Sequence, residues 1–358
     1  MNKHENGVFI NWKNAGYHPQ WFFYSKILDM ITLIFFIIST ILSLLYLIKS
    51  KEINIIIFHL FSTSIITLLI WNILKTSINI IAKRFIPMYA PNTVMKNVSI
   101  HIGGNLDLKG VILLPSKNLE NKESKIPIAI AFHGYNSGRG QLNFISFALV
   151  QLGMAVLSVD MRGHGESGGD RNDTLYILRD LNNILNYIYS QDIFDKNNIV
   201  TIGLSIGAII SLYEGYLDPR VKCVVGLATT SEYKTMISEN IKPLSRKWWW
   251  KLNQKIGGLE VDPSSLQSRL VSPALIAGCR KSFFDVPVPW EVDNAKRVLL
   301  LQCKNDYIVE PRNFESNINA FNLTPKNYEL FEKGGHGFTK QEIAVIGRII
   351  SFIIRKIK

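Results

Sequence analysis

The sequence IVTIGLSIGAIISLY, residues 199–213, joins an apolar strand pattern to a helical one through the pentapeptide Gly203-Leu204-Ser205-Ile206-Gly207. A serine at a sharp turn between strand and helix is held with its Oγ exposed, and the flanking glycines let neighbouring backbone pass close to the turn. The first N–H groups of the helix then face the group that Ser205 attacks. The pentapeptide alone recurs by chance, but the strand before it and the helix after it favour a nucleophilic serine.

Strand and helix patterns alternate on both sides of this stretch. Buried strands are predicted at residues 126–132, 155–159, 221–228 and 298–303, with a last strand at 328–331. Helices are expected at about 140–152, 175–189 and 311–321, and from 341 onward. Ahead of them, residues 98–102 and 108–114 are predicted to pair as a hairpin around Gly103-Gly104-Asn105. Such alternation is typical of an α/β fold with a parallel sheet covered by helices on both faces.

The N-terminal part of the chain has a different composition. Residues 27–48 and 53–74 are almost wholly apolar, and each segment is long enough to cross the hydrocarbon core of a bilayer. The aromatic-rich residues 1–26 suit a membrane interface. Lys49-Ser50-Lys51-Glu52 follows the first segment, where a cleaved signal peptide would need small residues. We therefore expect two transmembrane helices within residues 27–82; the alternative is a buried helical hairpin of a soluble protein.

The charges beside the two apolar segments predict their orientation. Lys49 and Lys51 lie in the tight loop, and five basic residues lie outside the hairpin: Lys13, Lys26, Lys75, Lys83 and Arg84. This bias places both ends of the hairpin in the cytoplasm. We therefore expect a multi-pass protein of the cell membrane in which the segment 1–26 and the catalytic domain are cytoplasmic. Three cysteines, an odd number, agree with free thiols in a reducing compartment: Cys223, Cys279 and Cys303.

The net charge of +12 is unevenly spread along the 358 residues. Residues 1–96 hold nine Lys/Arg and three Asp/Glu, so the rest of the chain is only mildly basic for its size. This distribution argues against nucleic acid as the main partner and suits an anionic membrane surface, with the lipid bilayer as a partner.

A nucleophilic serine needs a base, and the base needs a group that orients it. Of the seven histidines, only His336 follows Ser205, and it lies in a glycine-rich loop directly after the last predicted strand. Asp306 follows the strand before that one and is the predicted acid. The less favoured acids are Asp293, Asp285 and Glu310. Three suitable residue types at three strand ends together predict a Ser205-His336-Asp306 triad.

The second requirement is an oxyanion hole, in which two N–H groups converge on the developing negative charge. One predicted donor is the N–H of Ile206, the residue after the nucleophile. The other comes from the loop His133-Gly134-Tyr135, where we expect the N–H of Tyr135 to serve. His133 itself is expected to brace this loop and not to act as a base. This chemistry requires neither a metal nor an organic cofactor.

Five motifs together resemble the α/β-hydrolase superfamily. They are His133-Gly134, the loop Asp160-x-Arg162-Gly163-x-Gly165-x-Ser167, Gly203-x-Ser205-x-Gly207, Asp306 at a strand end and Gly335-His336-Gly337-Phe338. They look most similar to the serine aminopeptidase-like and monoacylglycerol-lipase-like branch. The resemblance covers about residues 95–358 and implies an α/β-hydrolase domain with a mostly parallel sheet. In this family the loop from Asp160 to Ser167 is structural, and Arg162 is expected to join loops through charge-assisted hydrogen bonds.

The insertion at residues 231–296 interrupts the strand and helix alternation, and the resemblance makes it the cap that covers the site and selects the substrate. It holds Trp248-Trp249-Trp250 between basic residues. The tryptophans either form the core of the cap or enter the membrane interface while the lysines meet anionic head groups. Three consecutive tryptophans cannot share one face of a helix. Because the chain is also expected to be anchored, the membrane-facing interpretation is slightly favoured.

These observations predict a membrane-anchored serine hydrolase that cleaves a small acyl ester or a lipid ester through an acyl-enzyme intermediate. A serine peptidase or aminopeptidase is an alternative, and its cap carboxylate for a substrate amine would be Glu232, Glu239 or Asp262. An acyltransferase would use the same triad in a drier site. A non-catalytic binding module with the hydrolase fold is the alternative from another class. Nothing in the sequence indicates the oligomeric state.

Overall fold

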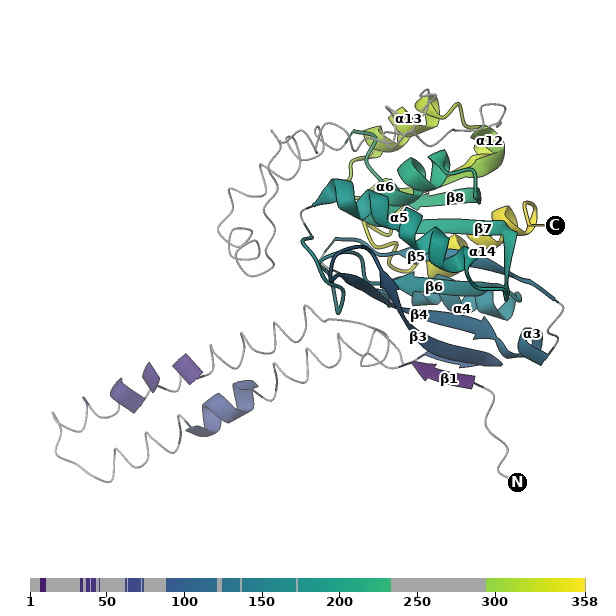
Figure 1. Cartoon of the computed structure of the whole chain (residues 1–358). Coiled ribbons are helices and arrows are strands. Elements are labelled where there is room, and N and C mark those ends of the chain that lie inside the picture. The colour runs from purple at the N-terminus through teal and green to yellow at the C-terminus, as the bar shows by residue number, and fades with distance from the viewer. Residues whose placement is uncertain are drawn as a thin grey trace. The chain divides into compact units, whose positions relative to one another are not determined.

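The structure is a computed structural model that describes residues 7–10, 33–34, 37–38, 40–42, 45, 62, 64–71, 73, 88–120, 124–135, 137–171, 173–232 and 294–357 (Figure 1). The chain divides into two compact units, one of Met1–Tyr17 with Tyr89–Lys358 and one of His18–Met88. Most of the predicted membrane hairpin lies outside the described residues, as do the three tryptophans, Cys279 and nearly all of the insertion at 231–296.

An eight-stranded sheet forms the centre of the larger unit, in the order β10-β9-β8-β7-β5-β6-β4-β3. The strands are β3 (Thr93–His101), β4 (Asp107–Pro115), β5 (Ile126–Phe132), β6 (Ala155–Val159), β7 (Phe194–Leu204), β8 (Val221–Leu227), β9 (Val298–Cys303) and β10 (Tyr328–Phe331). Neighbours from β10 to β6 pair in parallel, whereas β4 pairs antiparallel with β6 and with β3. The predicted parallel sheet is confirmed, and so is the predicted β-hairpin of residues 98–102 and 108–114, which β3 and β4 form.

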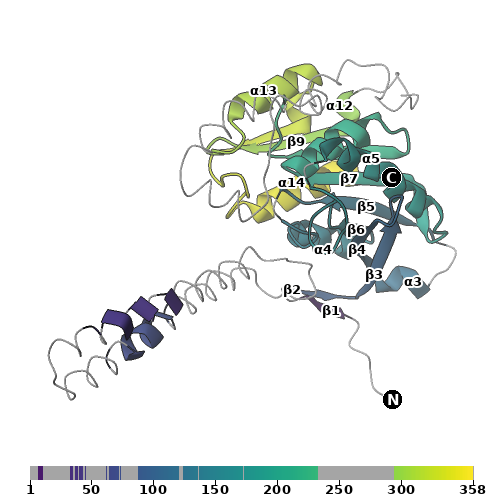
Figure 2. The ribbon, with the colours of Figure 1, turned by 60° about the vertical axis from the view of Figure 1, so that its left-hand side comes forward.

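Helices cover both faces of this sheet. They are α3 (Ser116–Glu120), α4 (Asn143–Gln151), α5 (Thr174–Tyr189), α6 (Ile206–Ile210), α12 (Asn294–Arg297), α13 (Pro311–Ala320) and α14 (Glu342–Ile354), with a π-helix η1 (Ser211–Gly215) and a 3₁₀ turn η3 (Pro325–Asn327). Helices α4 and α14 pack against each other on one face, and α5 packs against α6 and η1 on the other (Figures 1 and 2). Both faces of the central strands are therefore buried, which explains their continuous apolar sequences.

The parallel arrangement determines where chemistry can occur. Because β5 to β10 all point the same way, their carboxyl ends lie along one edge of the sheet, where binding sites of such sheets form. This edge carries the residues that follow β5, β6, β7, β9 and β10. All five motifs named above therefore meet at one edge.

Several elements differ in extent from their predictions, and β3 begins at Thr93, five residues before the predicted strand at 98–102. Strand β7 begins at Phe194, five residues before the apolar run at 199–202. The predicted helix at 208–213 begins at Ile206 and continues from Ser211 as a π-helix. There Gly215 lies against β7, since a Cβ on Gly215 would come within 2.6 Å of Thr201 Oγ1. Such close packing between residues far apart in sequence is not visible in a local pattern.

Outside the main sheet, β1 (Gly7–Ile10) pairs with β2 (Met88–Pro91) in a two-stranded sheet. In the smaller unit, the described residues between 33 and 45 and between 62 and 73 are helical. Within the described ranges, no helix has both the length and the apolarity that crossing a membrane requires.

Candidate active site

Ser205 follows β7 directly and has an unusual backbone conformation. Its φ is 57° and its ψ is −116°, a left-handed region that costs a residue with a Cβ of the order of 1–3 kcal/mol. Its backbone N–H donates to the carbonyl of Leu227 at the end of β8, at 2.9 Å. The neighbouring strand thus holds Ser205 in a strained turn, which presents the side chain at the carboxyl edge of the sheet.

The two glycines of the pentapeptide are required by close backbone packing. A Cβ on Gly203 would lie 1.9 Å from the carbonyl oxygen of Gly207. A Cβ on Gly207 would lie 2.3 Å from the carbonyl oxygen of Phe132, at the end of β5. The turn that carries Ser205 is therefore pressed against the end of the adjacent strand, as the pentapeptide predicted.

Asp306 and His336 form a hydrogen-bonded pair at the same edge. His336 Nδ1 lies 2.8 Å from Asp306 Oδ2, and because a carboxylate only accepts, Nδ1 carries the proton. The Asp306 side chain is fully buried, whereas that of His336 is 23% exposed. In the neutral imidazole, Nε2 is then the acceptor, which is the tautomer that a general base requires.

Four donors hold the Asp306 carboxylate. Oδ1 accepts from the N–H groups of Ile308 and Val309 at 2.8 and 3.0 Å, and Oδ2 accepts from Gln302 Nε2 at 3.1 Å in addition to His336. Gln302, which the sequence analysis missed, also donates to the carbonyl of Val309 and so holds the Asp306 loop closed. The sequence did contain a sign of this role, because Gln302 is the polar residue in an otherwise apolar strand, four positions before Asp306.

Ser205 and the Asp306–His336 pair come from β7, β9 and β10, as predicted. Within the described parts of the chain, no hydrogen bond joins Ser205 Oγ to His336. Catalytic hydrogen bonds are often long in the absence of substrate, so this geometry is compatible with a triad. Glu310, one of the less favoured acids, pairs instead with Arg312 at 2.8 Å. Asp285 and Asp293 lie outside the described residues.

The predicted oxyanion loop lies beside Ser205. A Cβ on Gly134 would come within 3.5 Å of Ser205 Cβ. The carbonyl of Gly134 accepts from His133 Nδ1 at 2.7 Å and from the N–H of Ser137 at 3.2 Å. Because a peptide is planar and trans, holding this carbonyl also sets the direction of the Tyr135 N–H on its opposite side. The other predicted donor, the N–H of Ile206, belongs to the first residue of α6 and has no partner within that helix.

His133 braces this loop, as expected from the sequence. Its Nε2 accepts from the N–H of Met161 at 3.0 Å, so the proton on Nδ1 is the one donated to Gly134. The side chain is 1% exposed, and this burial, with the nearby His164, lowers the pKa of His133 to about 3. A neutral imidazole therefore links the ends of β5 and β6 throughout the ordinary pH range.

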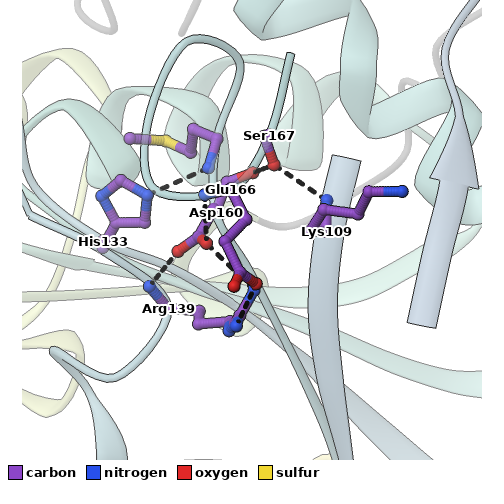
Figure 3. Close-up of polar contacts among 7 residues, drawn as sticks. Lys109, His133, Arg139, Asp160, Glu166 and Ser167 are labelled. Carbon is purple, nitrogen blue, oxygen red and sulfur yellow. Dashed lines mark hydrogen bonds and ion pairs between the residues drawn. The ribbon is translucent and has the colours of Figure 1, made fainter. Parts of the chain in front are cut away.

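A buried ion pair between Asp160 and Arg139 also holds the loop that follows β5 (Figure 3). Asp160 Oδ1 accepts from the backbone N–H of Arg139 at 2.7 Å, and Oδ2 accepts from Arg139 Nη1 at 3.0 Å and the N–H of Glu166 at 3.1 Å. Burial raises the pKa of the Asp160 carboxyl, while the N–H and the charge of Arg139 act in the opposite direction. Arg139 also binds the Glu166 carboxylate at 2.6 Å.

The rest of the Asp160 loop is fastened to neighbouring elements. Ser167 Oγ donates to the carbonyl of Asp160 at 2.5 Å and accepts from the N–H of Lys109 on β4 at 2.8 Å (Figure 3). Arg162 binds Asp180 of α5 through two hydrogen bonds of 3.0 and 2.5 Å. Arg162 thus makes the expected charge-assisted hydrogen bonds, but they join its loop to helix α5 and not to another loop.

Sequence comparisons find similarity to hydrolases. Residues 124–278 match the family described as Hydrolase_4, serine aminopeptidase, S33. The putative hydrolase YtaP of Bacillus subtilis is 26% identical over 160 residues, which cover 37% of this chain and 54% of YtaP. An uncharacterized 31.7 kDa protein of Escherichia coli, from the traX-finO intergenic region, is 26% identical over 125 residues, 34% of this chain and 44% of that protein. The chain thus spans about half the length of these curated relatives.

Solved structures show the same fold. The esterase Pf2001 of Pyrococcus furiosus superposes with a TM-score of 0.54 at 18% identity, covering 74% of this chain and 92% of the esterase. The acylaminoacyl peptidase of Pyrococcus horikoshii gives 0.55 at 17% identity, covering 75% of this chain and 42% of the peptidase. The chain therefore has the α/β-hydrolase fold, and its family match is to serine hydrolases.

Proposed function

We propose that this protein is a membrane-anchored serine hydrolase that cleaves acyl esters, including lipid esters. The observation that carries the proposal is the strained Ser205 turn, with the Gly134 loop beside it and the Asp306–His336 pair at the same sheet edge. Strained backbone of this kind persists where the surrounding packing maintains it, and it clusters at active sites.

The chemistry follows from these residues. Ser205 Oγ attacks the ester carbonyl carbon while His336 Nε2 takes the hydroxyl proton, and the carbonyl oxygen becomes an oxyanion facing the N–H groups of Ile206 and Tyr135. Collapse of this intermediate breaks the bond to the alcohol, which leaves with the proton from His336. Water then attacks the acyl-enzyme with His336 again as base, and the acid and free Ser205 are released. Asp306 holds His336 in the required tautomer throughout.

The family description gives a reason to test a second activity. The matched family is named for serine aminopeptidases, and a peptidase would use the same triad on an amide. The purified chain is therefore assayed against p-nitrophenyl acyl esters and against aminoacyl amides. We expect ester turnover that is lost in Ser205→Ala. Turnover of the amides alone would replace the esterase proposal with a peptidase, and full ester turnover in Ser205→Ala would reject both.

Membrane anchoring is supported by an inverted burial pattern in the smaller unit. All the exposed described residues between 33 and 45 and between 62 and 73 are leucine or isoleucine, with exposed fractions of 42–64%. The less exposed ones are Thr40, Ser62, Ser64, Thr67 and Trp71. A helix in water turns its polar side chains outward, whereas in a bilayer apolar residues face lipid and small polar residues face the neighbouring helix. This pattern favours lipid as the surroundings.

The orientation of the anchor rests on the flanking lysines and arginines described above, which favour both ends in the cytoplasm. In sealed spheroplasts, protease added outside should leave the hydrolase domain intact, and permeabilisation should expose it. Cleavage of the domain in intact spheroplasts would reverse the proposed orientation.

A further inference from the structure

Gly134 lies between the nucleophile and Gln141. The position that a Cβ on Gly134 would take lies 3.5 Å from Ser205 Cβ, 3.3 Å from Oε1 of Gln141 and 3.6 Å from Nε2 of Gln141. Because glycine has no Cβ, no side chain stands between Ser205 and the Gln141 carboxamide at this point.

The orientation of the Gln141 carboxamide follows from its hydrogen bond. Its Oε1 accepts from the N–H of Gly134 at 2.5 Å, and since an N–H can only donate, this atom must be the oxygen. The two N–H bonds of Nε2 are therefore left for another acceptor. In the part of the chain that the structure describes, Nε2 makes no hydrogen bond. Gln141 is thus oriented by the oxyanion loop and presents donors beside Ser205.

We propose that Gln141 is a catalytic residue that donates a hydrogen bond from Nε2 to the acyl oxygen as Ser205 attacks. This inference rests on the proposed hydrolase function and adds a side-chain donor to the N–H groups of Ile206 and Tyr135. The oxygen gains negative charge in the transition state, so the donated bond strengthens there and the interaction accelerates the reaction. The ligand group it recognises is the carbonyl oxygen of an ester or amide.

The competing role is a purely structural one, in which Gln141 only holds the N–H of Gly134. Two substitutions separate the roles. Gln141→Glu keeps an oxygen acceptor for Gly134 and removes the Nε2 donor. Gln141→Met has a similar length and lacks both groups. A structural role predicts that any loss in the glutamate variant comes from repulsion between its carboxylate and the oxyanion, and is therefore equal for an ester and its thionoester. A catalytic role predicts a loss that shrinks with the thionoester, because the missing donor matters less to sulfur.

The experiment measures kcat and KM for p-nitrophenyl butyrate with the full-length protein in detergent. Gln141→Glu is expected to lower kcat about 10²- to 10³-fold with little change in KM, as removal of an oxyanion donor does. The loss should shrink with the matching thionoester, because sulfur accepts hydrogen bonds poorly. An unchanged kcat in Gln141→Glu, or an equal loss with both substrates, would overturn the inference.

A second variant covers the case in which Gln141→Glu does not fold. Gly134→Ala would place one methyl group between Ser205 and Gln141, and the nearest neighbour, Gln141 Oε1 at 3.3 Å, would move by a few tenths of an ångström. It should lower kcat for the oxygen ester more than for the thionoester, and unchanged kinetics would reject the proposal. Labelling of wild-type Ser205 by a fluorophosphonate tests the hydrolase function separately. Labelled wild type with a fully active Gln141→Glu variant would reject only the role of Gln141.

Discussion

The positions of the three proposed catalytic residues depend on contacts made by other residues. This holds for Ser205, Asp306 and His336. The Ser205 turn requires glycine at 203 and 207, because any Cβ there would meet backbone oxygen at 1.9 or 2.3 Å. The Asp306 carboxylate requires two backbone donors and Gln302. The chemistry of each residue is therefore inseparable from the packing of the loop that carries it.

Asp306→Asn should abolish most of the activity without unfolding the protein. The two backbone N–H groups at Oδ1 hold the amide oxygen, so the amide nitrogen takes the place of Oδ2 and donates to His336 Nδ1. The imidazole then carries its proton on Nε2 and cannot accept from Ser205. We expect kcat for esters to fall about 10⁴-fold. The thermal midpoint should fall as well, because the amide nitrogen then faces the buried Gln302 Nε2 donor. A kcat within tenfold of wild type would show that Asp306 is not the orienting acid.

The triad residues could be predicted from the sequence because each directly follows an apolar strand and their order along the chain leaves one histidine. Gln302 could also have been found, as a polar residue within the apolar run 298–303. Gln141 could not, because its contact with Gly134 depends on the turn between them, and no spacing rule connects a glutamine to a glycine seven residues earlier.

At the scale of elements, the loop after β6 supports the loop after β5. Asp160 and Arg139 are both buried, and their ion pair joins these two loops beside the proposed oxyanion hole. Removal of one partner leaves the other as an uncompensated buried charge, which costs far more than the net contribution of the pair. Breaking this contact is therefore expected to destabilise the catalytic edge.

Arg139→Met should lower the free energy of unfolding by about 3–5 kcal/mol. The matched control is Lys304→Met, which removes an ion pair with Glu332 in which both side chains are at least half exposed. We expect the control to change stability by at most about 1 kcal/mol. Thermal midpoints of the two variants, measured side by side in detergent, check the prediction. Equal midpoints would mean that the buried pair contributes no more than a surface pair.

The π-helix η1 carries a group whose charge opposes folding. Burial raises the pKa of Glu214 to about 8, the negative charge of Asp218 acts in the same direction, and Arg179 opposes it. Its Oε1 is buried and has no hydrogen-bond partner among the described residues. Between about pH 4.5 and pH 8 the folded state therefore binds more protons than the unfolded state, and stability falls as pH rises.

Glu214→Gln should remove this pH dependence, because the amide stays neutral. The thermal midpoint of the variant is expected to exceed that of wild type by several degrees at pH 8.5 and to match it near pH 5. Midpoints measured across this pH range check the prediction. A constant difference between the two proteins over the whole range would contradict it.

The parallel sheet of the larger unit could be predicted, because buried parallel strands have continuous apolar sequences and alternate with helices. The order of its strands was not predicted. The start of β7 and the π-helix could not be predicted. Both depend on packing against neighbouring elements, such as the contact between Gly215 and Thr201, and the local sequence pattern of 199–213 does not show such contacts.

At the scale of the whole molecule, the chain joins the hydrolase unit to a unit whose described helices expose leucine and isoleucine. We predict that the full-length chain stays in the membrane pellet after an alkaline carbonate wash and is released by detergent. The apolar side chains exposed between 33 and 45 and between 62 and 73 provide the physical reason. Release of the intact chain by carbonate alone would reject membrane spanning and leave surface binding as the anchor.

The most direct test of the central claim is covalent labelling of Ser205. Membranes that contain the wild-type protein or Ser205→Ala are treated with a fluorophosphonate probe, which reacts with serines activated by a base. We predict strong labelling of the wild type, none of Ser205→Ala, and heavily reduced labelling of His336→Ala. Absence of labelling in folded wild-type protein, or equal labelling of Ser205→Ala, would contradict the assignment of Ser205 as the nucleophile.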